Sequence, residues 1–101
     1  MKPFYLYMLR CRGGAYYVGH TDDLVARMDQ HAAGTFDGYT ATRRPVELVF
    51  VCETQSRLEA LEREIQLKGW SRAKKEALIA GDWDRVHLLA RCYGERGRPV
   101  P

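Results

Sequence analysis

The sequence predicts an α+β fold in which helices flank a small three-stranded antiparallel sheet, in the order β-β-α-β-α-α-α. Three observations predict it. Two β-prone runs, residues 4–11 and 15–20, flank the pair Gly13-Gly14, which is typical of a hairpin turn. A third β-prone run, residues 46–52, follows a long loop. The segments around it carry helical periodicity, and three strands are too few for a doubly wound sheet.

The first helix is expected from Thr21 to about Ala33. Thr21 is a favourable N-cap residue, and Asp22 and Asp23 would place negative charge in the first turn, where the helix dipole favours it. Gly34 can end the helix in the left-handed conformation. The apolar residues at helical spacing are Leu24, Val25, Met28 and Ala32.

Residues 34–45 are expected to form a loop with two glycines, an aromatic pair and the run Arg43-Arg44-Pro45. The proline introduces the third strand, because it cannot continue a helix and favours an extended residue before it. That strand reads VELVFVC and is apolar on both faces, so it is expected to be covered on both sides.

Three further helices are expected after the third strand. Ser56 and Glu59 match a capping box, and Gly69 would end the helix that they begin. Its expected buried stripe is Leu58, Leu61 and Ile65. Ser71 would start the next helix, which ends at Gly81 and has Ala73, Ala77 and Leu78 as core candidates. A last helix is expected over residues 83–92. Residues 1–93 then form one domain, and residues 94–101 form a disordered tail.

Composition narrows the class of protein. A chain of 101 residues supports one modest core. No apolar run approaches the roughly 20 residues that span a bilayer, and no signal peptide is evident, so no membrane association and a cytoplasmic location are expected. Three cysteines without a CxxC pair argue against a disulfide framework and a zinc ribbon.

Positive charge is concentrated in the second half of the chain. The net charge is +3, and residues 54–101 carry ten basic and seven acidic side chains, which accounts for the whole excess. The run from Lys68 to Lys75 contains four basic residues and no acid. Such a run either neutralises phosphates or forms a solvated helix face.

Tyrosines mark one face of the predicted hairpin. Tyr5 and Tyr7 share a face of the first strand, and Tyr17 and Gly19 share a face of the second. Phenols beside a glycine that leaves room for close approach indicate a reactive surface, although ordinary strand aromatics would give the same pattern.

Charged side chains that suit phosphate chemistry follow the hairpin. Arg27 and His31 lie four apart and so project from one helix face. A guanidinium matches a phosphate in bidentate geometry. Glu64 lies at the edge of its helix's apolar stripe, where one carboxylate is a plausible anchor for a hydrated Mg²⁺.

These residues together resemble the GIY-YIG nuclease superfamily. Tyr5-Leu6-Tyr7 and Tyr17-Val18-Gly19 correspond to the two signature triplets, and GHTDDLVARMDQHAAG is similar to the pattern G-x-[TS]-x-x-L-x-x-R-x-x-x-H. Glu64 falls in ALEREIQLKGW, where the family has a glutamate. The segments YTATRRPVELVF and GWSRAKKEALI resemble small stand-alone bacterial members, so the resemblance covers residues 4 to about 81. Tyr5 replaces the family's first glycine, and the chain lacks the asparagine that many relatives carry late in the domain, offering only Asp82 there.

The resemblance implies metal-dependent hydrolysis of a phosphodiester bond. Glu64 would hold Mg²⁺ (or Mn²⁺), and Arg27 would stabilise charge on the phosphate. Tyr7 and Tyr17 would bind or activate the attacking water. His31 is the alternative base, since its ordinary pKa of about 6.5 suits neutral pH better than the tyrosine value of about 10. The choice between Tyr7 and His31 as the base stays open. The side chains expected to converge on one concave surface are those of Tyr7, Tyr17, Arg27 and Glu64.

DNA is the expected substrate, in repair or recombination. A chain of this length has no room for an attached DNA-binding domain, so weak sequence preference is expected, with targeting by structure or by a partner protein. Two alternatives remain, namely a nucleic-acid-binding module with little catalysis and a plain interaction domain. Candidate nucleic-acid contacts, each of which could instead line a loop or a solvated face, are Thr40, Arg43, Arg44, Lys68, Lys74 and Lys75.

Overall fold

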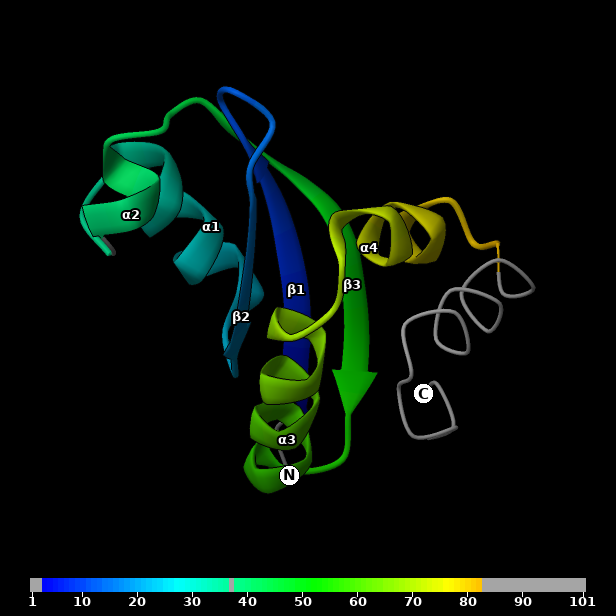
Figure 1. Cartoon of the computed structure of the whole chain (residues 1–101). Helices are drawn as coiled ribbons and strands as arrows, with labels where there is room; N and C mark the ends of the chain where they lie inside the picture. Colours follow the sequence, from blue (N-terminus) through cyan, green and yellow to red (C-terminus); the bar gives the residue numbers. More distant parts are fainter. Residues whose placement is uncertain (1–2, 37, 83–101) are drawn as a thin grey trace. The chain divides into compact units, whose positions relative to one another are not determined.

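The computed structural model describes residues 3–36 and 38–82 (Figure 1). The strands β1 (Phe4–Cys11), β2 (Tyr16–Thr21) and β3 (Val46–Thr54) form one antiparallel sheet in the order β2-β1-β3. The helices are α1 (Leu24–Ala33), α2 (Gly38–Ala41), α3 (Arg57–Lys68) and α4 (Arg72–Ile79). The chain divides into two units between Lys68 and Gly69, so the sheet and the first three helices form one unit and α4 belongs to the other. The predicted fold class is confirmed.

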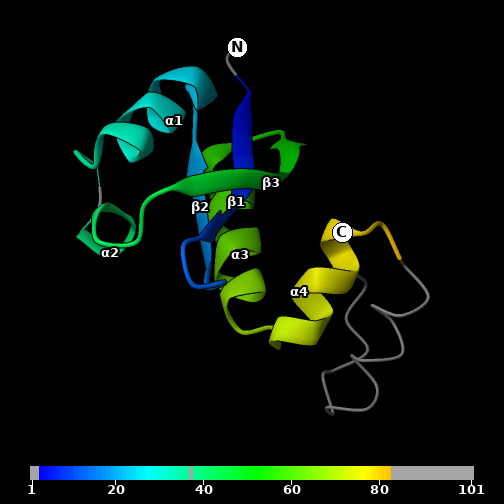
Figure 2. The same ribbon diagram turned by 90° about the horizontal axis from the view of Figure 1, so that it is seen from above.

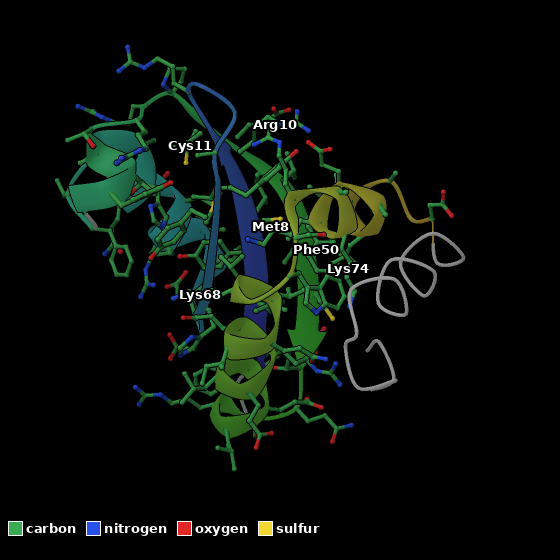
Figure 3. The ribbon with its side chains drawn as sticks, viewed as in Figure 1. Met8, Arg10, Cys11, Phe50, Lys68 and Lys74 are labelled. Carbon is green, nitrogen blue, oxygen red and sulfur yellow. The ribbon has the colours of Figure 1, made fainter. Side chains whose placement is uncertain are left out.

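The central strand β1 fixes which side chains share a face. Tyr7 lies opposite Gly19 of β2 and Val51 of β3, whereas Met8 lies opposite Val18 and Phe50 (Figure 3). Side chains alternate along a strand, so Tyr7 and Gly19 occupy one face and Met8 and Val18 the other. The registers place Tyr5 and Tyr17 on the Tyr7 face and His20 on the Met8 face.

Helices cover both faces of this sheet. α1 and α3 lie on opposite sides of it (Figure 2). His31, the buried residue of α1, reaches the Tyr7 face, and α3 buries Ala60 and Leu67. The residues of β1 from Leu6 to Leu9 are almost entirely excluded from water, which makes this strand the centre of the core.

The hairpin forms as predicted, but the first helix begins later than expected. Gly13 and Gly14 have φ of 90° and 93°, a region that suits glycine in a tight turn. Thr21 is the last residue of β2 rather than the N-cap. Asp23 is the N-cap, and its carboxylate accepts from the amide of Ala26 at 3.1 Å. Asp22 and Asp23 therefore precede the helix instead of occupying its first turn.

The expected loop contains a short helix. α2 is only four residues long, too short for a periodic sequence pattern. Arg44 ties it to α1, because its guanidinium donates to the carbonyls of Ala41 at 3.1 Å and Ala32 at 3.3 Å. These carbonyls lie at the ends of the two helices, where backbone acceptors lack helical partners.

The predicted buried stripe of α3 is wrong. Leu58 is 64% exposed, Leu61 39% and Ile65 64%. The helix instead turns Ala60, Glu64 and Leu67 inward, which have the same helical spacing. The small Ala60 permits close packing, and this rotation lets the Glu64 carboxylate meet a partner on the sheet. The sequence periodicity alone does not separate these two neighbouring faces.

The predicted cap of α3 is present with one change. The Ser56 hydroxyl accepts from the amide of Glu59 at 3.1 Å. The Glu59 carboxylate reaches back to the amide of Gln55 at 2.7 Å, one residue earlier than in the standard capping box. The helix ends at Lys68, before Gly69, as predicted.

Strand β3 is less covered than predicted. Leu48 is 41% exposed and Val51 44% exposed, and β3 forms one edge of the described sheet. The apolar character of both faces therefore does not mean burial on both. Cys11 is buried and Cys52 is partly exposed, and both are free thiols.

The second unit begins with Gly69. Ser71 caps α4, accepting from the amide of Lys74 at 3.1 Å. Ala77 and Leu78 are buried as predicted, whereas the third core candidate, Ala73, is only partly buried. The expected helix over 83–92 and the tail over 94–101 lie outside the described residues, so the single domain over 1–93 stays a prediction. In the described part of the chain, no helix has the length and apolarity needed to cross a bilayer.

Candidate active site

A chain of hydrogen bonds joins three fully buried side chains of β1, α1 and α2. The Tyr7 hydroxyl and Nε2 of His31 are 2.8 Å apart, and Nδ1 of His31 lies 2.9 Å from Oγ1 of Thr40. All three residues are 0% exposed. Each ring nitrogen of His31 thus has a defined partner, which fixes the orientation of the imidazole.

Gly19 makes the position of Tyr7 attainable. A Cβ atom at Gly19 would lie 2.7 Å from the Tyr7 hydroxyl oxygen and 2.8 Å from Cζ. Any side chain there would collide with the buried ring, because a close-packed core has no space to absorb it. The close approach expected from the sequence is therefore present, and the glycine is required by the ring beside it.

Replacing Gly19 with alanine is expected to lower the free energy of unfolding by about 1–3 kcal/mol, because the added methyl group overpacks the core against Tyr7. Urea denaturation of the purified protein measures this. Gly38→Ala is the matched control, since a Cβ there meets no atom within 4 Å. Equal midpoints for Gly19→Ala and the wild type would contradict the proposed tight fit.

Aromatic rings surround the buried chain. The Tyr17 ring centroid lies 6.4 Å from that of Tyr7 and 5.3 Å from that of His31. Phe36 meets the His31 ring at 5.0 Å, and Tyr39 stacks on Tyr17 at 6.2 Å. The roles of Phe36 and Tyr39 were not predicted from the sequence, where they stood only as an aromatic pair in a loop.

Arg27 lies one turn before His31 on α1. Its guanidinium covers the Phe36 ring at 3.7 Å from the centroid. Nε donates to Oε1 of Gln30 at 3.2 Å, and Nη1 donates to the carbonyl of His20 at 3.3 Å. These contacts hold the guanidinium against the Phe36 ring, the Gln30 side chain of the same helix and the backbone of β2.

Glu64 projects from α3 and has both carboxylate oxygens in short contacts. Its side chain is 13% exposed. Oε1 lies 2.6 Å from Nδ1 of His20, and Oε2 lies 2.8 Å from Nζ of Lys68, on the last turn of α3 (Figure 3). Burial raises the pKa of Glu64, but the hydrogen bonds and charges of Lys68 and His20 outweigh it, so the pKa lies below its ordinary value. The carboxyl group is therefore ionised at neutral pH.

His20 on the edge strand β2 lies between Arg27 and Glu64 and bonds to both. Tyr7, Tyr17 and His31 lie on one face of the sheet, whereas the His20 ring points to the other face and to Glu64. Arg27 reaches the backbone carbonyl of the same histidine. Arg27 and Glu64 thus meet at His20 on an edge of the sheet. The convergence of Tyr7, Tyr17, Arg27 and Glu64 on one concave surface stays a prediction. The sequence does not indicate the partner of His20, because its contact with Glu64 joins residues 44 positions apart.

The candidate nucleic-acid contacts occupy different environments. Thr40 is buried behind His31 and offers no surface to a nucleic acid. The Arg43 guanidinium lies over the Tyr39 ring at 3.8 Å, and Arg44 bonds the helix ends described above. Lys68 pairs with Glu64 and is exposed.

The two candidate lysines of α4 belong to the second unit. Lys74 is buried, with its ammonium 3.9 Å from the centroid of the Trp70 ring, so it is not an exposed phosphate contact. Burial lowers the pKa of Lys75. Three of the six predicted nucleic-acid contacts carry their positive charge on the first unit, namely Arg43, Arg44 and Lys68.

Glu64 has the chemistry of a divalent-metal ligand, although it acts singly. Within residues 3–36 and 38–82, no group of three or more His, Cys, Asp or Glu side chains could hold a metal ion. An ionised, partly buried carboxylate still fits a hard cation such as Mg²⁺, whose remaining ligands are usually water and substrate phosphate. Such binding would require Lys68 to share or leave Oε2.

The chain belongs to the GIY-YIG family, since the model of the GIY-YIG catalytic domain matches residues 3–77. This family comprises nuclease-type domains, which act on nucleic acid and typically use a divalent metal.

Its relatives include small bacterial proteins named UPF0213. The UPF0213 protein SSP2268 of Staphylococcus saprophyticus is 39% identical over 80 residues, covering 79% of this chain and 98% of the relative. A solution NMR structure of the UPF0213 protein BH0048 from Bacillus halodurans has 38% identity and a TM-score of 0.51, covering 77% of this chain and 83% of the other. The protein EF2693 of E. faecalis has 34% identity and a TM-score of 0.57, with coverage of 80% and 86%.

Proposed function

We propose that this protein is a metal-dependent endonuclease that hydrolyses DNA phosphodiester bonds with weak sequence preference. The observation that carries the proposal is the buried hydrogen-bonded chain Tyr7–His31–Thr40 beside Arg27. A phenol bonded to an imidazole whose second nitrogen is also bonded is an arrangement suited to moving a proton. Hydrolysis requires a proton to leave the attacking water.

The Tyr7 hydroxyl oxygen takes the proton from the attacking water while its own proton passes to Nε2 of His31. Both are fully buried, so we assign to Tyr17, which is partly exposed and contacts both rings, the task of orienting the attacking water. Thr40 keeps the imidazole in place from behind. It is a positioning residue, and its burial prevents contact with a nucleic acid.

Two groups would stabilise the negative charge of the phosphate, namely the guanidinium of Arg27 and the metal ion held by Glu64. Arg27 presents the Nη2 edge of its guanidinium, since Nε and Nη1 already bond to Gln30 and His20. Hydrogen bonds from a fixed guanidinium stabilise the charge that develops on phosphate oxygens. Glu64 would hold the Mg²⁺ or Mn²⁺, and such an ion, when bound, neutralises the same charge.

The second candidate function is a nucleic-acid-binding module without cleavage. Two observations favour it. The sequence has no asparagine, and both Glu64 oxygens have protein partners. In either case we assign DNA as the substrate, in repair or recombination, with targeting by DNA structure or by a partner protein.

Cleavage assays on labelled DNA test the proposal directly. The full chain is incubated with single-stranded, duplex and branched DNA in Mg²⁺ or Mn²⁺. We expect internal cuts in at least one of these substrates, no products in EDTA, and recovery on adding excess metal. Salt-dependent binding without cleavage in either metal would overturn the proposal in favour of the binding module.

A further inference from the structure

Two exposed aromatic side chains border the candidate active site. Phe36 is 40% exposed and Tyr39 41% exposed, although both lie in a segment held against α1. Each ring carries an arginine, with Arg27 over Phe36 at 3.7 Å and Arg43 over Tyr39 at 3.8 Å. Each ring also contacts the site, Phe36 through His31 and Tyr39 through Tyr17. Two columns of contacting side chains therefore lead inward from the surface. Phe36 meets His31 edge-on, and Tyr39 stacks on Tyr17, which contacts Tyr7 and His31.

The arginines of these columns keep their positive charge available. In the part of the chain that the structure describes, neither Arg27 nor Arg43 forms an ion pair. Their hydrogen bonds go to neutral acceptors, namely backbone carbonyls, the amide of Gln30 and the hydroxyl of Thr42. A guanidinium stacked on an aromatic ring also fixes a flat surface that is wider than the ring alone.

We infer that Phe36 and Tyr39, with the arginines stacked on them, bind unpaired bases of the nucleic-acid substrate. The inference rests on the proposed function and names its substrate class as DNA with a single-stranded segment next to the cut. Paired bases are covered by their neighbours in the duplex, whereas an unpaired base offers a free face. We place that base on the outer face of the guanidinium whose inner face lies on each ring. Phosphates flanking that base meet Arg27 and Arg43.

Binding measured without cleavage tests this inference independently of the proposed catalysis. Fluorescence anisotropy in EDTA compares the full chain on a labelled thymidine strand, the matching duplex, and a strand with abasic sites in place of the bases. We expect the thymidine strand to bind at least about tenfold more tightly than the abasic strand, because stacking contributes about 1–3 kcal/mol per base. A ribothymidine strand, which carries the same base, shows whether deoxyribose is required.

Substitutions locate the bases on the protein. Phe36→Ala and Tyr39→Ala are each expected to weaken binding of the thymidine strand by about 5- to 100-fold, with binding of the abasic strand changed less than about twofold. Phe36→Leu and Tyr39→Leu preserve apolar volume and should lose the same preference. Tyr16→Ala is the matched control, since Tyr16 also has an arginine near its ring, Arg10 at 5.7 Å, but on the other face of the sheet.

The outcomes separate this inference from the proposed function. Equal binding of the thymidine and abasic strands by the wild-type protein would overturn the inference, and that comparison needs no variant to fold. Unchanged base preference in folded Phe36→Leu and Tyr39→Leu proteins would also overturn it. If the protein binds bases with a clear preference but cleaves no DNA, the proposed catalysis is wrong and the inferred base-binding surface stands.

Discussion

Replacing Glu64 with glutamine is expected to reduce metal-dependent cleavage by about 10²–10⁴-fold, because the change removes the charge that would hold the metal and keeps the shape of the side chain. Glutamine can still accept a hydrogen bond from His20 and fill the space beneath α3. Its neutral amide binds a hard cation far more weakly than a carboxylate does. Single-turnover cleavage on the preferred DNA measures the loss.

A second readout separates metal binding from catalysis. Mn²⁺ affinity, measured by titration calorimetry with the DNA present, should fall in Glu64→Gln together with the cleavage rate. Glu62→Gln is the matched control, an exposed glutamate on the same helix. Wild-type cleavage by purified Glu64→Gln would mean that another group anchors the metal or that a contaminant cuts the DNA.

Replacing Tyr7 with phenylalanine is expected to lower the cleavage rate by about 10²–10⁴-fold, the usual contribution of a positioned proton acceptor. The change removes the hydroxyl that lies 2.8 Å from Nε2 of His31 and leaves the ring in place. It also leaves a buried imidazole nitrogen without that partner, which should reduce stability by about 1–3 kcal/mol.

Tyr5→Phe is the control for Tyr7→Phe, because Tyr5 lies two residues away on the same face of β1. It should cleave at nearly the wild-type rate. The pH dependence of cleavage gives a further check, since loss of the Tyr7–His31 pair should change its profile rather than only scale it. An unaltered profile and rate in Tyr7→Phe would assign the buried chain to stability alone.

Local features of the fold were predictable from the sequence. The Gly13-Gly14 turn, the left-handed Gly34 and the Ser71 cap each depend on a few neighbouring residues whose conformational preferences are strong. The alternation along β1 placed Tyr5 and Tyr7 on one face for the same reason. Thr21 failed as a cap because β2 extends through it and the next suitable side chain, Asp23, takes the role.

Features that depend on contacts between distant segments were not predictable. α3 turns Ala60 and Leu67 inward and brings Glu64 to His20, whereas the sequence suggests a more apolar stripe of Leu58, Leu61 and Ile65 on a neighbouring face of the helix. Thr40 stood as a surface contact because nothing in the sequence indicates that it lies under His31. The sequence indicates candidate site residues, whose roles stay predictions, but it does not indicate which residues they contact.

The meeting point at His20 has an evolutionary consequence. Arg27, which lies beside the Tyr7–His31–Thr40 chain, and Glu64 approach from opposite faces of the sheet, and both bond to His20 of this edge strand. Substitution of Glu64 therefore leaves the contacts of Tyr7, His31 and Thr40 untouched. One mutational step would separate a cutting protein from one that only holds its nucleic acid, and the reverse step would be equally short.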